Sequence, residues 1–243
     1  MNESQLLKAI GLPKSTHVLK TLPYNQLETR LTATQKKVIS EQVVVRGMRI
    51  LASIQSNNTN IEAFESEIER FDAIVFLAIH VKNVKKAVQV YKVLMSVIPN
   101  PLVILFYDDV QTRWLFATHE KKKDGYLVSN QLYEIYEAVT ISQVEQQLNF
   151  DDLNKSNLKT LYETWIERLL QIELQIRYSM YAPITLQNNV LENLIIMDGQ
   201  INDYVKQAKK ETQLNKRVEL QQAANKIKLQ KQALIEKEQN NGK

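Results

Sequence analysis

The sequence contains no cysteine among its 243 residues, and it is poor in glycine, proline and histidine. The absence of cysteine excludes disulfides, thiolate metal sites and a cysteine nucleophile. The three histidines, His17, His80 and His119, are far apart in sequence, which argues against a zinc site built on histidine. Glycine and proline occur only five times each. Because their usual shares are roughly 7% and 5%, long helical elements with few tight turns are expected.

Long apolar runs are also missing. The longest, Ala73–Ile79, has seven residues, whereas a membrane-spanning helix needs roughly 18. The N-terminal residues 1–5 are polar, and no apolar segment typical of a secretory signal follows them. Together with the lack of cysteine, these features predict a cytoplasmic protein with no membrane segment.

The charge is distributed unevenly over an otherwise ordinary composition of 44% apolar and 24% charged residues. Residues 203–243 carry ten Lys or Arg and five Asp or Glu, a net charge of +5. The other 202 residues carry 21 and 22, a net charge of −1. A basic tail on a near-neutral body favours contact with a polyanion or an acidic partner, while the plainer alternative is a solvated helix.

Hydrophobic periodicity predicts an α+β fold with a small mixed sheet covered by helices. Short apolar segments bounded by polar residues indicate strands near 73–81, 102–107, 113–119 and 132–139. The five residues between the second and third of these predict a hairpin. Helical spacing indicates helices at 34–53, 84–98 and 156–176.

Residues 183–243 form a predicted C-terminal helical extension to a globular domain at 1–182. Residues 184–241 contain no proline and one glycine, Gly199, where a break between two helices is expected. Its apolar positions recur partly at heptad spacing, as in a coiled coil, although Lys231 takes a core position and Ala224 is small.

The sharpest enzymatic hypothesis is a metal-dependent nuclease of the PD-(D/E)xK type. Asp108 or Asp109 ends one predicted strand, and Glu120 and Lys121 follow the next. These groups lie at opposite ends of the returning strand, about 25 Å apart, too far for one metal ion. A divergent nuclease drawing carboxylates from Glu67, Asp72 and Glu120 remains an alternative. Since neither a phosphate-binding glycine loop nor a G-x-S-x-G elbow is present, no catalytic residue, metal ligand or cofactor is assigned.

Two candidate binding surfaces lie in the extension. An apolar surface for docking on a partner is predicted from residues at helical spacing: Ile201, Tyr204, Val205, Leu220, Ile227 and Leu234. A nucleic-acid-binding surface, extended by lysines 82–92 and 121–123, is the alternative use of basic residues at three-, four- and seven-residue steps: Lys206, Lys209, Lys210, Lys216 and Arg217.

Several stretches resemble a bacterial family of unknown biochemical function. They are 12–16 with 22–23, 49–54 with 59–61, the Val-Ile-Pro-Asn-Pro junction at 97–101, 158–163 and 213–220. The members of this family are encoded beside helicases and DNA methyltransferases in restriction-like loci. The family carries carboxylates in the strand that corresponds to 76–82, where this chain keeps only Lys82.

The resemblance implies which genes lie beside the gene of this protein, but it implies no mechanism. We therefore expect a non-catalytic accessory or adaptor subunit of a bacterial DNA-targeting, anti-phage defence complex, docking through its C-terminal helices on a helicase or methyltransferase. The alternatives are the divergent nuclease and a DNA-binding or self-associating structural protein.

Overall fold

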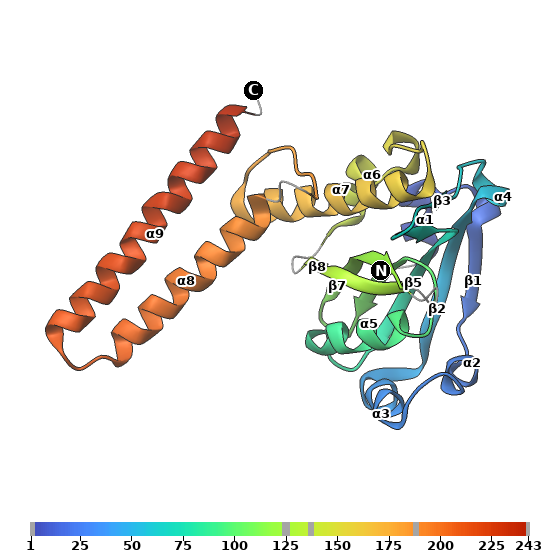
Figure 1. Cartoon of the computed structure of the whole chain (residues 1–243), viewed down its shortest axis with the longest axis horizontal. Helices are drawn as coiled ribbons and strands as arrows, with labels where there is room; N and C mark the ends of the chain where they lie inside the picture. Colours follow the sequence, from blue (N-terminus) through green and yellow to red (C-terminus); the bar gives the residue numbers. More distant parts are fainter. Residues whose placement is uncertain (1–2, 123–126, 136–138, 187–189, 242–243) are drawn as a thin grey trace. The chain divides into compact units, whose positions relative to one another are not determined.

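The computed structural model describes residues 3–122, 127–135, 139–186 and 190–241. The chain divides into two compact units, Met1–Leu169 and Leu170–Lys243. Figure 1 labels the helices and strands of both units.

The first unit is built on a mixed six-stranded sheet with the strand order β1-β2-β5-β6-β7-β8. Only β5 and β6 pair in parallel, and all other neighbours are antiparallel. A separate two-stranded hairpin joins β3 (Phe64–Glu65) to β4 (Arg70–Phe71). The six strands of the main sheet are β1 (His17–Thr21), β2 (Val43–Gln55), β5 (Ala73–Val81), β6 (Leu102–Tyr107), β7 (Thr112–Lys121) and β8 (Leu127–Ile135).

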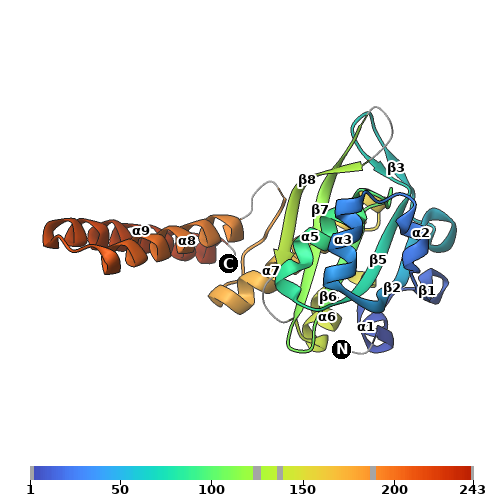
Figure 2. The same cartoon turned by 90° about the horizontal axis from the view of Figure 1, so that it is seen from below.

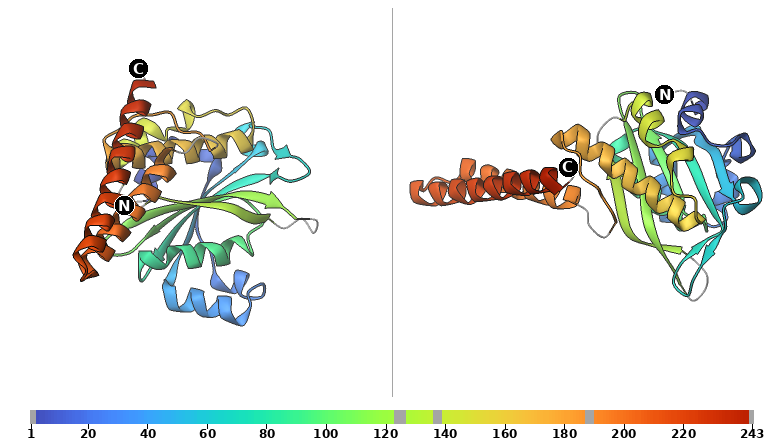
Figure 3. Two further views of the ribbon diagram at one scale, coloured as in Figure 1. Left: turned by 60° about the vertical axis from the view of Figure 1, so that its left-hand side comes forward. Right: turned by 90° about the horizontal axis from the view of Figure 1, so that it is seen from above.

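Helices cover both faces of this sheet, as the left panel of Figure 3 shows. On one face lie α3 (Ala33–Gln42) and α5 (Ala87–Met95), the latter preceded by the short turn η2 (Val84–Lys86). The first part of α7 (Leu158–Tyr178) covers the other face. Alternate residues of each strand therefore point into one of two apolar layers. The remaining short elements are α1 (Glu3–Ile10), η1 (Lys14–Thr16), α2 (Tyr24–Glu28), α4 (Ser56–Thr59), α6 (Ile141–Gln147) and η3 (Phe150–Asp152).

Two buried tyrosines, one from each helical layer, meet at the start of β6. The hydroxyl of Tyr91 in α5 donates to the carbonyl of Leu102 at 3.2 Å, and the hydroxyl of Tyr162 in α7 lies 3.0 Å from the same oxygen. The Tyr162 oxygen also accepts from the Ala117 N–H of β7 at 3.2 Å. Burial raises the pKa of both phenols, so both stay neutral donors. Tyr162 thus contacts the backbone of Leu102 in β6 and of Ala117 in β7. Each of these residues lies two positions beyond Ile104 and Leu115, the last pair in the register between the two strands.

The mixed sheet agrees with the predicted α+β class, but the predicted helix at 34–53 is wrong in its second half. The structure has α3, capped by Thr32 and Gln35, and then β2 from Val43 onward. The run Val43-Val44-Val45 favours extended backbone because β-branched side chains are restricted in helices. Because β2 carries apolar residues on both faces, apolar positions also recur three and four residues apart, which is the spacing typical of a helix.

The strand predicted at 132–139 begins earlier, at Leu127, and is described to Ile135; residues 136–138 lie outside the described part of the chain. β1 was not predicted at all, because its five residues, HVLKT, lack a clear apolar alternation.

The second unit contains the end of α7 and two long helices, α8 (Val190–Lys210) and α9 (Leu214–Asn241). Figure 2 shows α8 and α9 lying side by side as a hairpin. The predicted break at Gly199 is wrong: α8 continues through this residue, and the turn lies at 211–213. A glycine in a helix interior costs only about 1 kcal/mol relative to alanine, which the packing of a long helix offsets.

Candidate functional site

The two helices of the hairpin meet along a seam of regularly spaced half-buried or buried residues. In α8 the spacing alternates between three and four, as in a coiled coil, over Leu191, Leu194, Asp198, Ile201, Val205 and Ala208. In α9 the same alternation runs over Leu220, Ala224, Ile227, Lys231 and Leu234. Each helix of the hairpin therefore buries its apolar stripe against the other.

A polar contact lies within this seam. The Lys231 ammonium donates to Asp198 Oδ1 at 2.6 Å, and the Tyr178 hydroxyl donates to Asp198 Oδ2 at 2.7 Å. Lys231 also lies 4.7 Å from the centre of the Tyr178 ring. Burial, followed by the hydrogen bond to Asp198, raises the pKa of the Tyr178 phenol. One carboxylate thus links α7, α8 and α9 and fixes which residues face each other.

The predicted docking residues mostly belong to the seam. Ile201, Val205, Leu220, Ile227 and Leu234 occupy seam positions, and Tyr204 is half-buried beside them. Apolar side chains that remain well exposed on the hairpin lie elsewhere: Ile196, Leu214, Val218 and Leu229. The sequence pattern identified the apolar stripes, but not that two stripes of the same chain face each other.

The predicted nucleic-acid-binding residues are brought together by the turn of the hairpin. Lys206, Lys209 and Lys210 lie in the last turns of α8, and Lys216 and Arg217 lie in the first turns of α9. All five are exposed, and no ion pair to them is found among the described residues. We call these five residues the basic tip.

One acidic residue lies inside this stretch, and its carboxylate is used by the backbone. Glu211 accepts from the Gln213 N–H at 2.9 Å. The pKa of Glu211 is lowered by this hydrogen bond, and by the Thr212 N–H and the charge of Lys216. With five cations and one acid, residues 204–218 carry a net charge of +4.

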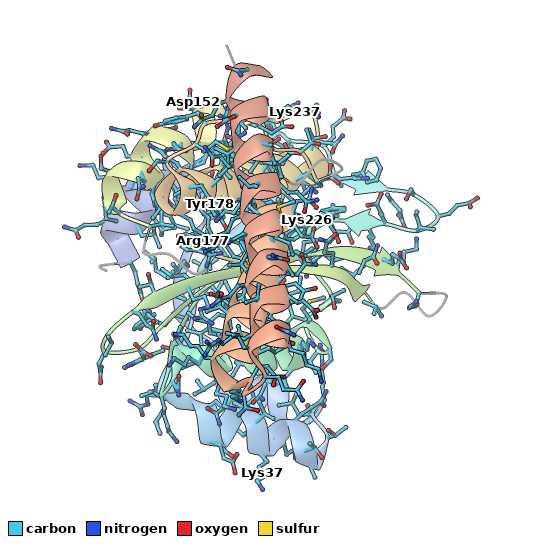
Figure 4. All side chains as sticks on the ribbon, turned by 90° about the vertical axis from the view of Figure 1, so that its left-hand side faces the viewer. Lys37, Asp152, Arg177, Tyr178, Lys226 and Lys237 are labelled. Atoms are coloured by element: carbon cyan, nitrogen blue, oxygen red, sulfur yellow. The ribbon has the colours of Figure 1, made fainter. Side chains whose placement is uncertain are left out.

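Cations from the two helices also share one depression in the surface. Lys209 of α8 and Arg217 of α9 line a hollow of about 410 Å³ together with Leu214 and Val218. Elsewhere on α9, Lys226 and Lys237 extend from one side of the helix (Figure 4). The hairpin thus presents cations at its turn and along α9.

A second polar cluster lies in the first unit, at the carboxyl ends of the parallel strands β5 and β6. The His80 ring stacks on Tyr107 with 4.8 Å between centroids, and its Nε2 is 3.8 Å from the Asp109 carboxylate. Arg49 of β2 pairs with Glu3 at 2.7 Å. Burial raises the pKa of the Tyr107 phenol, and the charge of Glu3 adds to this. Sequence reasoning missed this cluster because its members come from four distant segments.

Two of the carboxylates considered for a nuclease, Asp108 and Asp72, are used structurally. Asp108 accepts from the backbone N–H groups of Val84, Val110 and Gln111, which lowers its pKa. Glu67 and Asp72 belong to or flank the β3–β4 hairpin, and Asp72 pairs with Arg70. Among the described residues, no group of three or more His, Asp or Glu side chains is placed to hold a metal ion.

The fold and the surfaces define a mixed α/β protein with a C-terminal helical hairpin. Within the described part of the chain, no helix is both long and apolar enough to cross a membrane. Residues 10–230 match a family described as a domain of unknown function, DUF4391, and the chain belongs to this family. A search of curated proteins and a search of solved structures each find no significant match.

Proposed function

We propose that this protein is a non-catalytic accessory subunit of a bacterial DNA-targeting defence complex, and that its basic tip contacts the DNA backbone. The observation that carries the proposal is the gathering of five exposed cations by the turn between α8 and α9. Phosphate contacts from lysine and arginine position a protein on DNA without reading sequence. The resemblance of the sequence to a family encoded beside helicases and methyltransferases supplies the expected partners.

The position of the apolar residues bears on how a partner would dock. Because five of the six predicted docking residues lie in the seam, docking by these residues would require the hairpin to open. Docking by the outer faces would instead use Leu214, Val218 and Leu229, which are 61%, 41% and 69% exposed. Contact with a helicase or methyltransferase subunit through these outer residues is therefore our second candidate.

Fluorescence anisotropy with a labelled DNA duplex tests the first candidate. Changing Lys209, Lys210, Lys216 and Arg217 to Gln should flatten the slope of log K against log salt by up to about four, because each neutralised phosphate contributes nearly one unit. Gln has a helix propensity close to that of Lys, so the hairpin should persist by circular dichroism. An unchanged slope would contradict DNA contact by the tip.

Co-purification with neighbouring gene products tests the second candidate. Leu229→Asp should abolish co-elution with a helicase or methyltransferase. Gln239→Asp, at an exposed position of α9 beyond these residues, is the matched charge control. If the unaltered chain elutes alone beside its neighbours, the accessory-subunit proposal fails regardless of what the tip binds.

A further inference from the structure

A cavity of about 730 Å³ opens in the first unit between the segment that follows β1, helix α3 and the first part of β2. This volume lies within the range of small-molecule sites, roughly 300–1,000 Å³. Branched aliphatic side chains, including Leu22, Ile39 and Val43, make up much of its wall.

Among the described residues, Arg46 is the single charged one in the wall of this cavity. It is exposed, and no hydrogen bond or ion pair to its guanidinium is found among the described residues. A cation at an apolar wall without a protein anion is suited to an anionic group brought by a ligand.

The backbone that holds Arg46 is unusual and fixed. Arg46 has a φ of 59°, in the left-handed region that residues with side chains seldom adopt. The next residue must be glycine, because a Cβ on Gly47 would lie 2.8 Å from the carbonyl oxygens of both His80 and Val44. The register of β2 against β5 is irregular between Val43 and Met48, which marks a bulge. Bulges and positive φ values cluster where a protein holds a ligand.

We propose that this cavity binds an aliphatic carboxylate, with the hydrocarbon chain against the apolar wall and the carboxylate paired with Arg46. A carboxylate fits one planar guanidinium through two parallel hydrogen bonds. A phosphate monoester fits less well, because its second negative charge would be left against apolar surface without a partner. Tyr24 also lines the cavity, and its hydroxyl is a further donor for the carboxylate.

Isothermal titration calorimetry with decanoate and its neutral isostere decanamide tests the proposal on the full chain. The unaltered protein should bind decanoate at least roughly tenfold more tightly than decanamide, the value of one charge-assisted hydrogen bond. This comparison requires no variant, so it decides the matter even if a substitution prevents folding. Failure to bind decanoate, or equal binding of the two ligands, would overturn the proposal.

Three variants locate the site. Arg46→Gly removes the cation and tolerates the positive φ, and it should weaken decanoate binding by roughly tenfold while leaving decanamide unchanged. Arg46→Lys keeps the charge but loses the two parallel hydrogen bonds, so it should bind decanoate more weakly than the unaltered protein and more tightly than Arg46→Gly. Ser40→Trp, at an exposed position of the wall, should weaken both ligands. The control Lys14→Gln removes an exposed cation of the same unit and should change neither; equal losses in Lys14→Gln and Arg46→Gly would overturn the assignment to Arg46.

Discussion

Two glycines of this chain occupy opposite environments, and they make a matched pair for stability measurements. A methyl group on Gly47 would lie 2.8 Å from two backbone oxygens, whereas nothing lies within 4 Å of one on Gly199. Gly47→Ala should therefore lower the free energy of unfolding by about 2 kcal/mol or more, because the backbone must shift. Gly199→Ala should raise it by up to about 1 kcal/mol by favouring the helix. Urea unfolding measures both, and equal effects would contradict the close packing of Gly47.

His119 is buried beside the Tyr162 ring, and neither of its ring nitrogens has a hydrogen-bond partner in the part of the chain that the structure describes. Burial lowers its pKa from 6.5 to about 4. Between these values the unfolded chain binds a proton that the folded chain does not. Stability is therefore greatest above pH 6.5 and falls toward pH 4, by about 3 kcal/mol for this group.

The variant His119→Phe tests this effect, because it keeps an aromatic ring and removes the titrating group. Urea unfolding of both proteins at pH 7 and pH 4.5 should give a smaller loss of stability for the variant. An equal loss in the two proteins would mean that His119 is protonated in the folded state at pH 4.5.

At the scale of elements, the strands and helices with a single dominant signal were predictable from sequence. The strands at 73–81 and 102–107 have the predicted boundaries, and the returning strand of the hairpin, predicted at 113–119, runs from Thr112 to Lys121. The transition at Gln42–Val43 was not predictable from periodicity, because β2 is apolar on both faces. Gly47 was a signal against a helix at this point. The reason for a glycine there is visible only in the structure, because the backbone of His80 in β5 leaves no room for a side chain.

The seam of the hairpin was predictable in part. Lys231 at a core position looked like a defect of a coiled coil, because the sequence alone does not show which residue faces it. Asp198 shares the same heptad phase in α8, and this was the available signal. Because Lys231 and Asp198 face each other, the two polar residues at core positions pair and set the register of α8 against α9.

A double-mutant cycle on Asp198 and Lys231 measures this contact. The side chains are 37% and 21% exposed, so the pair is partly shielded from water. Asp198→Ala and Lys231→Ala should each destabilise the hairpin, with a coupling energy of about 1 kcal/mol in amide hydrogen exchange of α8 and α9. The pair Lys37 and Glu41, at 3.7 Å and 74% and 54% exposed, is the control and should show a coupling near zero. Comparable coupling in both pairs would argue against a register-setting role.

At the scale of the whole molecule, the excess of positive charge seen in the C-terminal sequence lies around the turn between α8 and α9. The basic residues of 203–217 were recognisable as a run, but the turn at 211–213 is what gathers them at one end of the hairpin. Their exposure and the backbone role of Glu211 depend on the fold. The cavity beside Arg46 was not predictable from sequence, because its walls come from segments that were predicted as loop and helix.

DNA binding through contact by the basic tip and DNA binding through the net charge of the whole chain predict different effects of replacing lysines. The net charge of the chain is +4, and replacing any four cations by Gln removes four positive charges. We compare the four-Gln tip variant with a body variant in which four exposed lysines outside the predicted nucleic-acid-binding surface become Gln: Lys8, Lys14, Lys20 and Lys37. If the tip holds the phosphates, the tip variant should lose most of the salt dependence and the body variant should keep it, although their net charges are equal. Equal flattening in the two variants would mean that long-range attraction by the whole molecule, rather than contact by the hairpin, accounts for binding.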